Sequence, residues 1–442
     1  MKKYNDIKTI GYPEYLEIEL NKNKYKIYDV ISNEDIIVDD NQKYPVLQEV
    51  TKPNENRIFD GCRFQSLCGG CVFMHTNYEY ELKKKKEYLN ELFSSFKFDI
   101  KINEMDDPYH YRNKSMMTYK ISKRGNVVCG FYEEHSHKLV PVTNCMLQSD
   151  KTNILIDKIN KILTKNKIKP YDENTRQGVL RHIYIRHSTN YNQIMVVFVT
   201  NGIDFPGRGN ILKDIKKENL KIDTIVQNIN PRDTSIVLGD TNKVLYGPGF
   251  IYEKVSDYKF KISPNSFFQV NTKGMEILYN LAIKKANLKK TDIVLDAYSG
   301  VGTISIFVSK YVKEVISVEL NRNAVKDAII NAKINNINNI DFVEADATSF
   351  ITNAAKNKEK IDVIIMDPPR DGSTKQFINA VSYLNVKKVI YISCGPESLK
   401  RDLYQFSLNN YHVESIEAVD MFPKTMHVET VCLLIFRSAP PK

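Results

Sequence analysis

The chain has 442 residues, of which 42% are hydrophobic and 26% are charged, with 18 glycines and 16 prolines. This composition is typical of a soluble globular protein and excludes intrinsic disorder, collagen-like repeats and a membrane protein, because the longest apolar runs (194–199 and 431–436) are strand-sized. The formal net charge of +10 favours a polyanionic partner such as nucleic acid, although a lysine-rich composition throughout gives the same charge without one.

Length and cysteine content set further limits. A chain of 442 residues exceeds what one hydrophobic core usually supports, so we expect two or three domains. The N-terminus has lysines but no apolar stretch behind them, unlike a secretory signal, and we expect a cytoplasmic protein. Thiols stay reduced there, so the seven cysteines indicate metal binding, catalysis or burial rather than disulfides.

The first 255 residues contain two patterns. Residues 1–56 alternate short apolar runs and predict a small antiparallel β unit. Residues 57–255 predict an α+β central domain, with helices at 77–96 and 149–164 and strands at 126–132, 181–187, 193–200 and 234–239. Four consecutive lysines at 83–86, inside the first of these helices, are most simply a solvated helix face.

Residues 256–442 predict a doubly wound parallel α/β sheet, because helices and continuous apolar strands alternate regularly. After a helix at 272–286, the expected strands are 292–297, 314–319, 341–345, 362–367 and 388–393, with helices at 302–312, 321–335 and 375–384. The last two strands, 413–420 and 429–436, have no helix between them and should be antiparallel neighbours. If the first of them is parallel to the rest, the start of the last strand lies on the edge that residue 394 reaches.

Clustered cysteines form a second motif in "CRFQSLCGGC" (62–71). The spacing is C-x5-C-x2-C, and a fourth cysteine follows downstream, which gives the candidate ligand set Cys62, Cys68, Cys71 and Cys145. Four thiolates suit a [4Fe–4S] cluster or zinc, and the spacing leaves both open. A redox pair is disfavoured because no thioredoxin-like βαβ pattern surrounds "CGGC", and structural thiols are the remaining alternative. Cys129 and Cys432 lie in expected strands and should be core residues.

The segment "DAYSGVGTISI" (296–306) reads as a strand, a glycine turn and a helix. Gly300, Gly302 and Ser305 stand where G-x-G-x-x-G/A has its small residues, which let a ligand approach the backbone at a helix N-terminus. Glu319 ends the next strand at the distance where an acidic side chain accepts hydrogen bonds from ribose hydroxyls. The pattern predicts a nucleoside cofactor at this edge, against the simpler reading of tight helix–strand packing.

Two further strand ends bring reactive groups to the same edge. Asp367 opens "DPPRDG" after one strand, and Cys394 follows the next in "YISCGPESLKRD" (391–402). D-P-P is typical of amino-methyltransferase loops, but Arg370 stands where those enzymes have an aromatic residue. By itself, Cys394 is either a nucleophile or a small buried hydrophobic residue.

Taken together in this order, these motifs resemble the S-adenosylmethionine-dependent RNA uracil-C5 methyltransferases. The resemblance is specific in "SPNSFFQVN" (263–271), "DAYSGVGT", "MDPPRDG", "YISCGPESLKRD" and "FPKTMHVETV" (422–431). Upstream support comes from "YRNKSMMTY" (111–119), "RHIYIR" (181–186) and the cysteine motif. The resemblance implies a Rossmann-like class I methyltransferase sheet with an antiparallel last strand, preceded by the central domain and the small N-terminal β unit.

The resemblance also implies roles for individual residues. Cys394 would be the nucleophile and Glu429 the proton acceptor. The implied cofactor-binding residues are Gln269, Tyr298, Gly300, Glu319, Asp346 and Asp367. Val301 stands where some members carry Asn, so any cofactor contact from that side chain is absent here.

The chemistry explains these residue types. Carbon 5 of uracil is a poor nucleophile, so a thiolate first adds at carbon 6 to create an enolate that attacks the sulfonium methyl. A carboxylate on the opposite face then removes the proton from carbon 5, and the thiol is eliminated. Because an ordinary thiol is only a few per cent ionised at neutral pH, we expect Arg370 or the amino end of the following helix to lower the pKa of Cys394.

The resemblance favours 23S ribosomal RNA as the substrate and partner and a [4Fe–4S] cluster over zinc, because the ribosomal members carry such a cluster and the transfer RNA members generally do not. The target base must be splayed out of the RNA, and the basic and aromatic residues of 111–114, 181–187 and 83–86 suit phosphate and base contacts.

Residues 1–56 stand where many relatives have a small RNA-binding barrel, called TRAM, and would be a reduced version of it. We expect a monomer with no membrane association. The alternatives are the same reaction on the T-loop uridine of transfer RNA, amino-methylation of a nucleic acid, and a non-catalytic ribosome-assembly factor.

Overall fold

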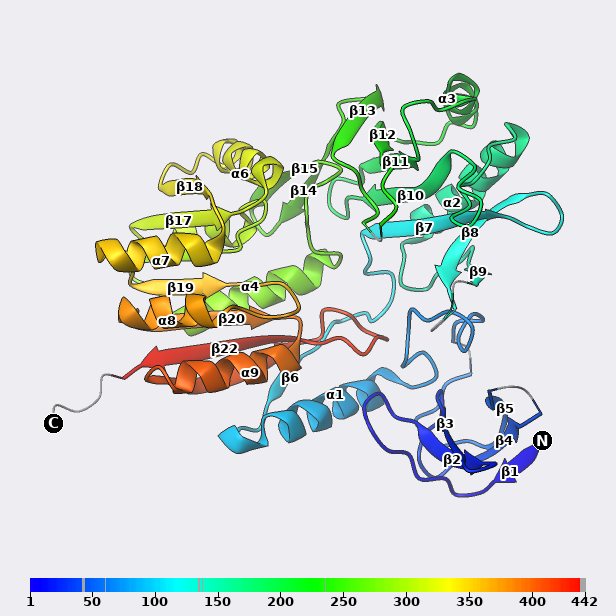
Figure 1. The fold of residues 1–442 in the computed structure, drawn as a ribbon, viewed down its shortest axis with the longest axis horizontal. Coiled ribbons are helices and arrows are strands. Elements are labelled where there is room, and N and C mark those ends of the chain that lie inside the picture. The colour runs from blue at the N-terminus through cyan, green and yellow to red at the C-terminus, as the bar shows by residue number, and fades with distance from the viewer. Residues whose placement is uncertain (42–43, 60, 134–135, 137, 235, 438–442) are drawn as a thin grey trace.

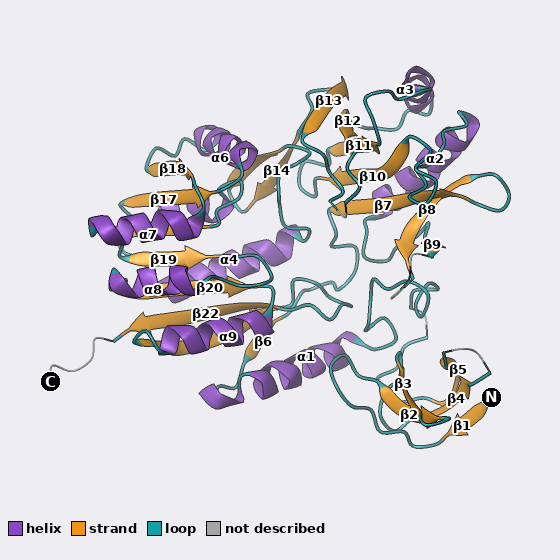
Figure 2. Cartoon of the chain, viewed as in Figure 1, coloured by secondary structure: helices purple, strands orange, loops and turns teal. Residues whose placement is uncertain are grey.

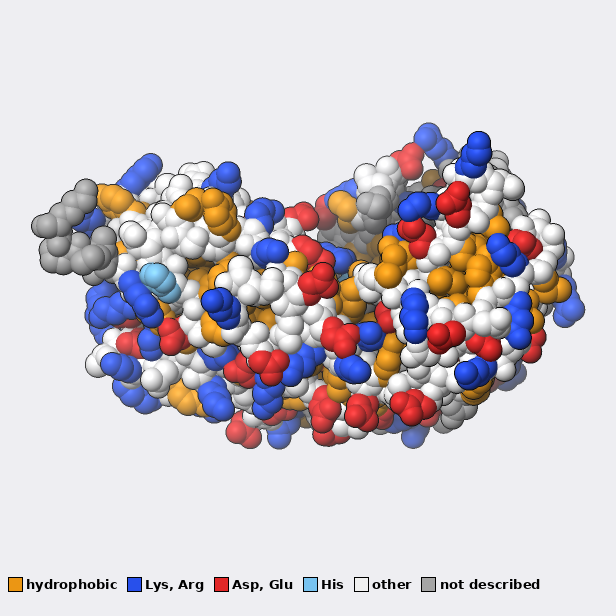
Figure 3. Space-filling model, turned by 90° about the horizontal axis from the view of Figure 1, so that it is seen from below, with side chains coloured by type: hydrophobic (Ala, Val, Ile, Leu, Met, Phe, Trp, Pro, Cys, Tyr) orange, Lys and Arg blue, Asp and Glu red, His pale blue; other side chains and the backbone are white. Residues whose placement is uncertain are grey.

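The computed structural model describes residues 1–41, 44–59, 61–133, 136, 138–234 and 236–437. Figure 1 shows the C-terminal α/β layers on one side, a second sheet on the other, and a small N-terminal β unit below the second sheet. On the face seen in Figure 3 the surface is hollowed between the two lobes, and basic side chains are interspersed with acidic ones. The net positive charge therefore does not form one continuous basic surface on that face.

The C-terminal sheet has eight strands among the described residues, in the order β18-β17-β16-β19-β20-β22-β21-β6. The strands are β16 (Ile293–Ala297), β17 (Glu314–Glu319), β18 (Ile340–Glu344), β19 (Val363–Met366), β20 (Lys388–Ser393), β21 (Tyr411–Val419), β22 (Glu429–Phe436) and β6 (Lys101–Asn103). Strands β16 to β20 pair in parallel, while β22 is antiparallel to both β20 and β21. Both predictions, the parallel sheet and the antiparallel last strand, are confirmed.

Helices cover both faces of this sheet (Figure 2). They are α4 (Thr272–Ala286), α5 (Thr303–Ser309), α6 (Arg322–Ile334), α7 (Ala347–Asn357), α8 (Lys375–Tyr383) and α9 (Pro396–Ser407). Helices α4, α5 and α6 share one hydrophobic core with the sheet, and α7, α8 and α9 share the other. Burial of the parallel strands between these two cores explains why they read as continuous apolar runs.

The segment from α1 (Tyr78–Leu92) through η1 (Ser94–Phe96) to β6 packs on the C-terminal sheet, although the sequence analysis grouped it with the central domain. Leu89, Phe93 and Ile100 join the core under α8 and α9. The expectation that the lysines at 83–86 form a solvated, RNA-contacting face is wrong for Lys85, which is fully buried. Its ammonium group is paired with two carboxylates, so burial does not leave the charge uncompensated.

The central sheet has seven strands among the described residues, in the order β13-β12-β11-β10-β7-β8-β9. The strands are β7 (Lys114–Ile121), β8 (Val127–Tyr132), β9 (Leu139–Pro141), β10 (Leu180–His187), β11 (Ile194–Thr200), β12 (Thr224–Ile229) and β13 (Thr241–Tyr246). Helices α2 (Asp150–Lys165) and α3 (Arg208–Lys217) belong to the same region, and α2 shares its core.

The strand predicted at 234–239 is wrong, and the edge strand is β13 instead; residue 235 lies outside the described part of the chain. Side chains take the hydrogen bonds that a ladder would need here. The Asn230 amide donates to the carbonyls of Ile236 and Val237 at 2.7 and 2.9 Å. The Asn228 side chain donates to the Gly239 carbonyl and accepts from the Gly239 N–H.

Two smaller β units complete the fold. The hairpin of β14 (Ile251–Val255) and β15 (Tyr258–Ile262) packs on α6, where Asn331 and Asn335 accept from the backbone N–H groups of Lys261 and Lys259. The N-terminal unit contains β1 (Lys2–Tyr4), β2 (Leu16–Leu20), β3 (Asn23–Ile27), β4 (Asp35–Asp39) and β5 (Val46–Lys52) around its own core, as predicted. Across the described ranges, no helix combines the length and the apolar character that a membrane crossing requires.

Candidate active site and cysteine cavity

The carboxyl ends of the parallel strands gather the predicted site residues along one edge. Tyr298, Glu319, Asp346, Asp367 and Cys394 end or follow β16, β17, β18, β19 and β20 respectively. The ladder is parallel and in continuous register from β18 to β20, so these positions share one side of the sheet. Ligands of open α/β sheets bind at this edge.

The glycine turn after β16 has the backbone shape that the sequence predicted. Gly300 and Gly302 have φ of +55° and +77°, and a Cβ on Gly302 would come within 3.0 Å of the Ala328 side chain. A Cβ on Gly300 would meet no atom within 4 Å, so there is open space above the turn. Glu319 accepts from the N–H groups of Gly300 at 3.0 Å and Asn321 at 2.7 Å, and thereby fixes the turn as well as ending β17.

Tyr298 and Asp346, two further predicted cofactor-binding residues, make different local contacts. Tyr298 has a left-handed φ of 66°, and its hydroxyl lies 3.3 Å from the Ser373 hydroxyl; burial raises the pKa of its phenol. Asp346 is exposed and accepts from the Ser349 N–H at 2.8 Å, so it is the N-cap of α7. A capping role alone would account for the aspartate at this position.

Gln269 lies in the segment that enters α4 and is held by the central domain. The Asn113 side chain donates to the Gln269 carbonyl at 3.0 Å, and the Asn113 N–H donates to the Val270 carbonyl at 2.8 Å. The motif at 111–119 thus packs directly on the motif at 263–271. Two of the stretches that supported the family resemblance are therefore in contact in space.

Cys394 and Glu429 come from adjacent antiparallel strands. The β20–β22 ladder ends at the pair Ser393 and Thr430, and Cys394 and Glu429 are the next residues beyond this pair on the two chain segments. The Glu429 charge acts on the Cys394 thiol, so the two side chains are near each other. The Thr430 hydroxyl donates to the Ser393 carbonyl at 3.2 Å and ties the strand ends together. Glu429 is 2% exposed, whereas Cys394 is partly open to solvent. The sulfur and the carboxylate therefore meet at one site.

The electrostatics of this site differ from the prediction. Burial, together with the nearby Glu429 and Asp367 charges, raises the pKa of Cys394 to about 11, although Arg370 acts in the opposite direction. The expectation of a lowered pKa is therefore wrong: Arg370 acts in the expected direction, but burial and the two carboxyl groups outweigh it. Arg370 is exposed, so solvent screens its charge, while two poorly solvated carboxylates act on the thiol.

The two carboxyl groups at the site also hold protons unusually tightly. Burial raises the pKa of Asp367 to about 7, and burial together with the Asp367 charge raises the pKa of Glu429. Two carboxylates that repel each other in a poorly solvated site tend to retain a proton. A cationic ligand placed between these groups would favour ionisation of all three acids, including the thiol of Cys394.

Sequence reasoning missed Asp296, at the end of β16. This residue is fully buried, and burial raises the pKa of its carboxyl to about 7. One carboxyl oxygen accepts from the Ser305 hydroxyl at 2.5 Å, while the other has no hydrogen-bond partner in the described structure. The orphaned oxygen and the open space above Gly300 fit a polar ligand at this edge, as a nucleoside cofactor requires. The signal was an aspartate inside an otherwise apolar strand.

A buried ion-pair network anchors the loop between β21 and β22. Lys85 of α1 lies 2.7 Å from both Glu81 and Asp420. The Glu81 carboxylate also accepts from the backbone N–H of Lys424 at 2.6 Å, and the Lys424 ammonium donates to the Thr76 carbonyl at 3.0 Å. The sequence signal was the i, i+4 spacing of Glu81 and Lys85. The network fixes the loop that leads into β22.

The four motif cysteines line one cavity of about 370 Å³, together with other residues that include Arg112 and Lys114: Cys62, Cys68, Cys71 and Cys145. Burial and proximity to one another raise the pKa values of the last three of these thiols. In the described part of the chain, no three or more His, Cys, Asp or Glu side chains have an arrangement that could hold a metal ion. The four thiols therefore share a cavity but do not form a closed ligand sphere. Cys129 and Cys432 are buried in the cores, as predicted.

The cysteine segment packs against the same loop as the ion-pair network. The backbone N–H groups of Val72 and Phe73 donate to the Lys424 carbonyl at 2.9 and 3.2 Å. These residues directly follow Cys71 in the chain. The segment that ends the cysteine motif is therefore hydrogen-bonded directly to the loop before β22.

Comparison with known proteins identifies the family. The model of the tRNA (uracil-5-)-methyltransferase family matches residues 77–437. An uncharacterized RNA methyltransferase of Oceanobacillus iheyensis is 34% identical over 97% of this chain and 93% of its own, and one of Clostridium tetani is 35% identical over 90% and 88%. The crystal structure of the Pyrococcus abyssi tRNA (uracil-54, C5)-methyltransferase in complex with S-adenosyl-L-homocysteine has a TM-score of 0.77 at 25% identity and covers 98% of this chain and 99% of that one. The chain therefore belongs to the tRNA (uracil-5-)-methyltransferase family, the S-adenosylmethionine-dependent RNA uracil-C5 methyltransferases.

Proposed function

We propose that this protein methylates carbon 5 of a uridine in 23S ribosomal RNA through a covalent adduct between Cys394 and carbon 6 of the base. The observation that carries the proposal is that Cys394 and Glu429 directly adjoin the last pair of the β20–β22 ladder, with the Glu429 charge acting on the thiol. A flat pyrimidine placed there has a sulfur and a carboxylate within reach of adjacent ring atoms. The methyl group would come from S-adenosylmethionine.

The proposed sequence of steps uses the two side chains in turn. The Cys394 thiolate adds to carbon 6, and the electron pair of the C5–C6 double bond moves to carbon 5 and its adjacent carbonyl as an enolate. Carbon 5 would then use this electron pair to bond the methyl group, whose bond to the sulfonium sulfur breaks, and S-adenosylhomocysteine would be left. Glu429 removes the remaining hydrogen of carbon 5 as a proton, the double bond re-forms, and the sulfur leaves carbon 6 as a thiolate.

Glu429 must be ionised when it accepts that proton. Its raised pKa makes the ionised carboxylate a stronger acceptor for that proton, and the bound sulfonium would favour the ionised form during the reaction. Asp367, Glu319 and the open turn at Gly300 would hold the cofactor, with Gln269, Tyr298 and Asp346 at the edges of the same site. Asp367 would then set both the position of the cofactor and the charge on Glu429.

Ribosomal RNA is proposed as the substrate because of the cysteine motif. Cys62, Cys68, Cys71 and Cys145 supply the thiol donor set of a [4Fe–4S] cluster, and a cavity of about 370 Å³ is larger than a single ion requires. Loading would draw the four sulfurs together around the cluster, which would brace the segment that contacts Lys424. Zinc is the alternative occupant.

A uridine of transfer RNA is the second candidate substrate. It is favoured by the full-length similarity to the Pyrococcus abyssi tRNA (uracil-54, C5)-methyltransferase. The decisive experiment is incubation of the purified protein with methyl-labelled S-adenosylmethionine and either unmodified 23S ribosomal RNA or unmodified transfer RNA, followed by mapping of the labelled nucleotide. Label confined to transfer RNA would refute the ribosomal assignment, and label on an exocyclic amine would refute uracil-C5 chemistry.

A further inference from the structure

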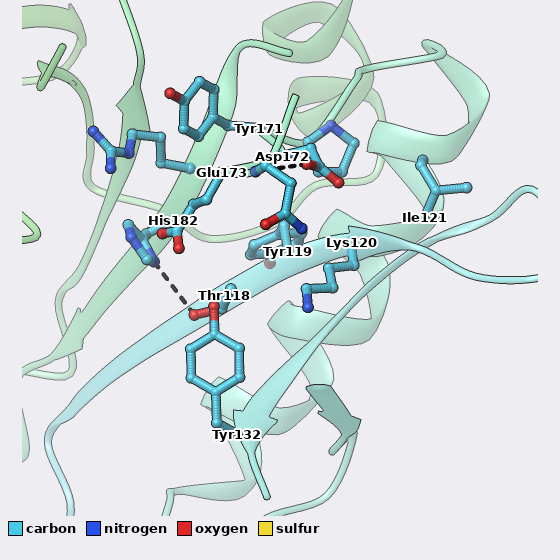
Figure 4. Close-up of a pocket in the computed structure, with 12 residues that line it drawn as sticks. Thr118, Tyr119, Lys120, Ile121, Tyr132, Tyr171, Asp172, Glu173 and His182 are labelled. Carbon is cyan, nitrogen blue, oxygen red and sulfur yellow. Dashed lines mark hydrogen bonds between the residues drawn. The ribbon is translucent and has the colours of Figure 1, made fainter. Parts of the chain in front are cut away.

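A second cavity lies outside the active site, on the central sheet. It has a volume of about 410 Å³ and is formed by β7, β8, β10 and the loop before β10. Figure 4 shows Tyr171 and Tyr132 at opposite ends of the group, with His182 and Thr118 between them. None of these residues takes part in the methyl-transfer steps described above.

Aromatic rings and cations share the walls of this cavity. The Arg181 guanidinium lies 4.9 Å from the ring centroid of Tyr171, and the Lys120 ammonium lies 5.5 Å from that of Tyr132. Single-stranded nucleic acid is bound by such combinations, because every base can stack on an aromatic ring and its phosphate can contact a cation. The two tyrosines thus offer stacking surfaces next to positive charge.

The polar groups of the cavity provide both donors and acceptors. Arg181 is 6% exposed, and its Nε is buried without a hydrogen-bond partner in the described structure, although its Nη1 donates to the carbonyls of Asn230 and Arg232. Glu173 presents an exposed carboxylate at the cavity wall. His182 is neutral, because burial and the Arg181 charge lower its pKa to about 4, and its Nδ1 lies 3.4 Å from the Thr118 hydroxyl.

Guanine is the base that matches this set. Its N1–H and N2–H₂ groups are adjacent donors, which a single carboxylate such as Glu173 can accept, and its O6 and N7 are acceptors for a cation. Cytosine and adenine each present one exocyclic amine instead, and uracil has no amine.

The cavity also lies along strands that lead to the active site. The pair Thr118 and His182 is followed four residues along β7 by the pair Lys114 and Arg186, about 13 Å away at 3.3 Å per residue.

The far end of these strands contacts the cofactor-binding segment. Arg186 donates to the Phe268 carbonyl, next to Gln269. Most of β10 is buried, but Met116 of β7 is exposed between the two ends, so an RNA strand with its target base at Cys394 would follow β7 to the cavity. We propose that this cavity binds one guanine base of the RNA substrate, near the target uridine, and so helps to select the RNA. The proposal rests on the proposed function for its RNA, but its first test does not need methyl transfer.

The first test is titration of the full-length protein with GMP, AMP, CMP and UMP, with S-adenosylhomocysteine present to occupy the cofactor site. GMP should bind most tightly. Tyr171→Leu should weaken GMP binding by roughly 5- to 150-fold, the range of a lost base stack. Glu173→Gln should reduce the preference for GMP over AMP. Tyr383→Leu and Glu218→Gln, exposed residues of α8 and of the end of α3, are the matched controls and should bind GMP as the wild type does.

Equal binding of the four nucleotides, no GMP binding at roughly millimolar concentration, or wild-type GMP binding by both cavity variants would overturn the proposal. A second test measures methylation of the RNA that the wild type accepts. Tyr171→Leu should raise KM by a similar factor with kcat unchanged, and an unchanged KM would overturn the proposal. If the wild type methylates no RNA but GMP binding depends on Tyr171 and Glu173, the proposed function fails and the cavity assignment stands.

Discussion

Replacement of Glu429 by Gln should trap the protein on its RNA. Glutamine has the shape of glutamate, so it fits a position that is 2% exposed at the start of β22, but it cannot accept the proton from carbon 5. A positioned general base contributes about 10²- to 10⁴-fold, or roughly 3 to 5 kcal/mol of barrier. Because Asp367 is the other carboxyl group whose charge acts at this position, we expect it to accept the proton in place of Glu429, which would put the loss near the lower end of this range.

The assay is denaturing gel electrophoresis of the Glu429→Gln variant after incubation with end-labelled RNA and S-adenosylmethionine. A slow band should accumulate within one turnover, contain the transferred methyl group and disappear when Cys394→Ser is added to the variant. Glu414→Gln, an exposed glutamate of β21, is the control and should turn over normally. Release of methylated RNA by Glu429→Gln at a rate within about tenfold of wild type would remove Glu429 from the role of base.

Three further predictions concern other parts of the molecule. Because the pKa of the Cys394 thiol is about 11, its rate of alkylation by iodoacetamide should rise about tenfold per pH unit from pH 7 to 10. Glu429→Gln should shift this plot of rate against pH to lower pH. A rate that levels off below pH 9 would contradict the assigned electrostatics. Lys85→Met should lower the free energy of unfolding, measured with urea, by about 3 to 5 kcal/mol, because it leaves buried carboxylates without their cation. Lys83→Met, at an exposed position, should change it by no more than about 0.5 kcal/mol. Equal urea midpoints for the two variants would refute the network. Protein purified without oxygen should contain about four irons per chain and lose them in Cys71→Ser, and stoichiometric zinc would refute the cluster.

The parts of the fold that local chemistry determines could be predicted from the sequence. The helix expected at 272–286 has these bounds in the structure, because the Asn271 side chain caps it and accepts from the Gly274 N–H at 3.0 Å. The order of reactive groups along the sheet edge was predictable as well, since parallel strands bring their carboxyl ends to one side. The strand expected at 234–239 failed because asparagine side chains 6 to 11 residues away took its hydrogen bonds.

Long-range burial was the part that the sequence could not supply. Lys85 reads like its three lysine neighbours, and only its distance of 2.7 Å from Asp420, 335 residues away, makes it a core residue. The pKa of Cys394 failed for a related reason. Arg370 is as visible in the sequence as Asp367, but the sequence does not say that the arginine is exposed while two carboxyl groups beside the thiol are poorly solvated.

The loop that leads into Glu429 shows why the N-terminal part of the chain matters for the chemistry. Residues 420–428 contain no helix or strand, so their position depends on tertiary contacts. Three segments from the first hundred residues supply several of these contacts: the Tyr12 hydroxyl donates to the Met426 carbonyl at 2.7 Å, the segment after Cys71 holds Lys424, and α1 holds Asp420. A base that must meet one proton on one face of a ring tolerates little displacement. On the proposed mechanism, the cysteine segment and the N-terminal unit therefore help to position the base that removes the proton, so substitutions at these contacts should slow release of methylated RNA more than formation of the covalent adduct.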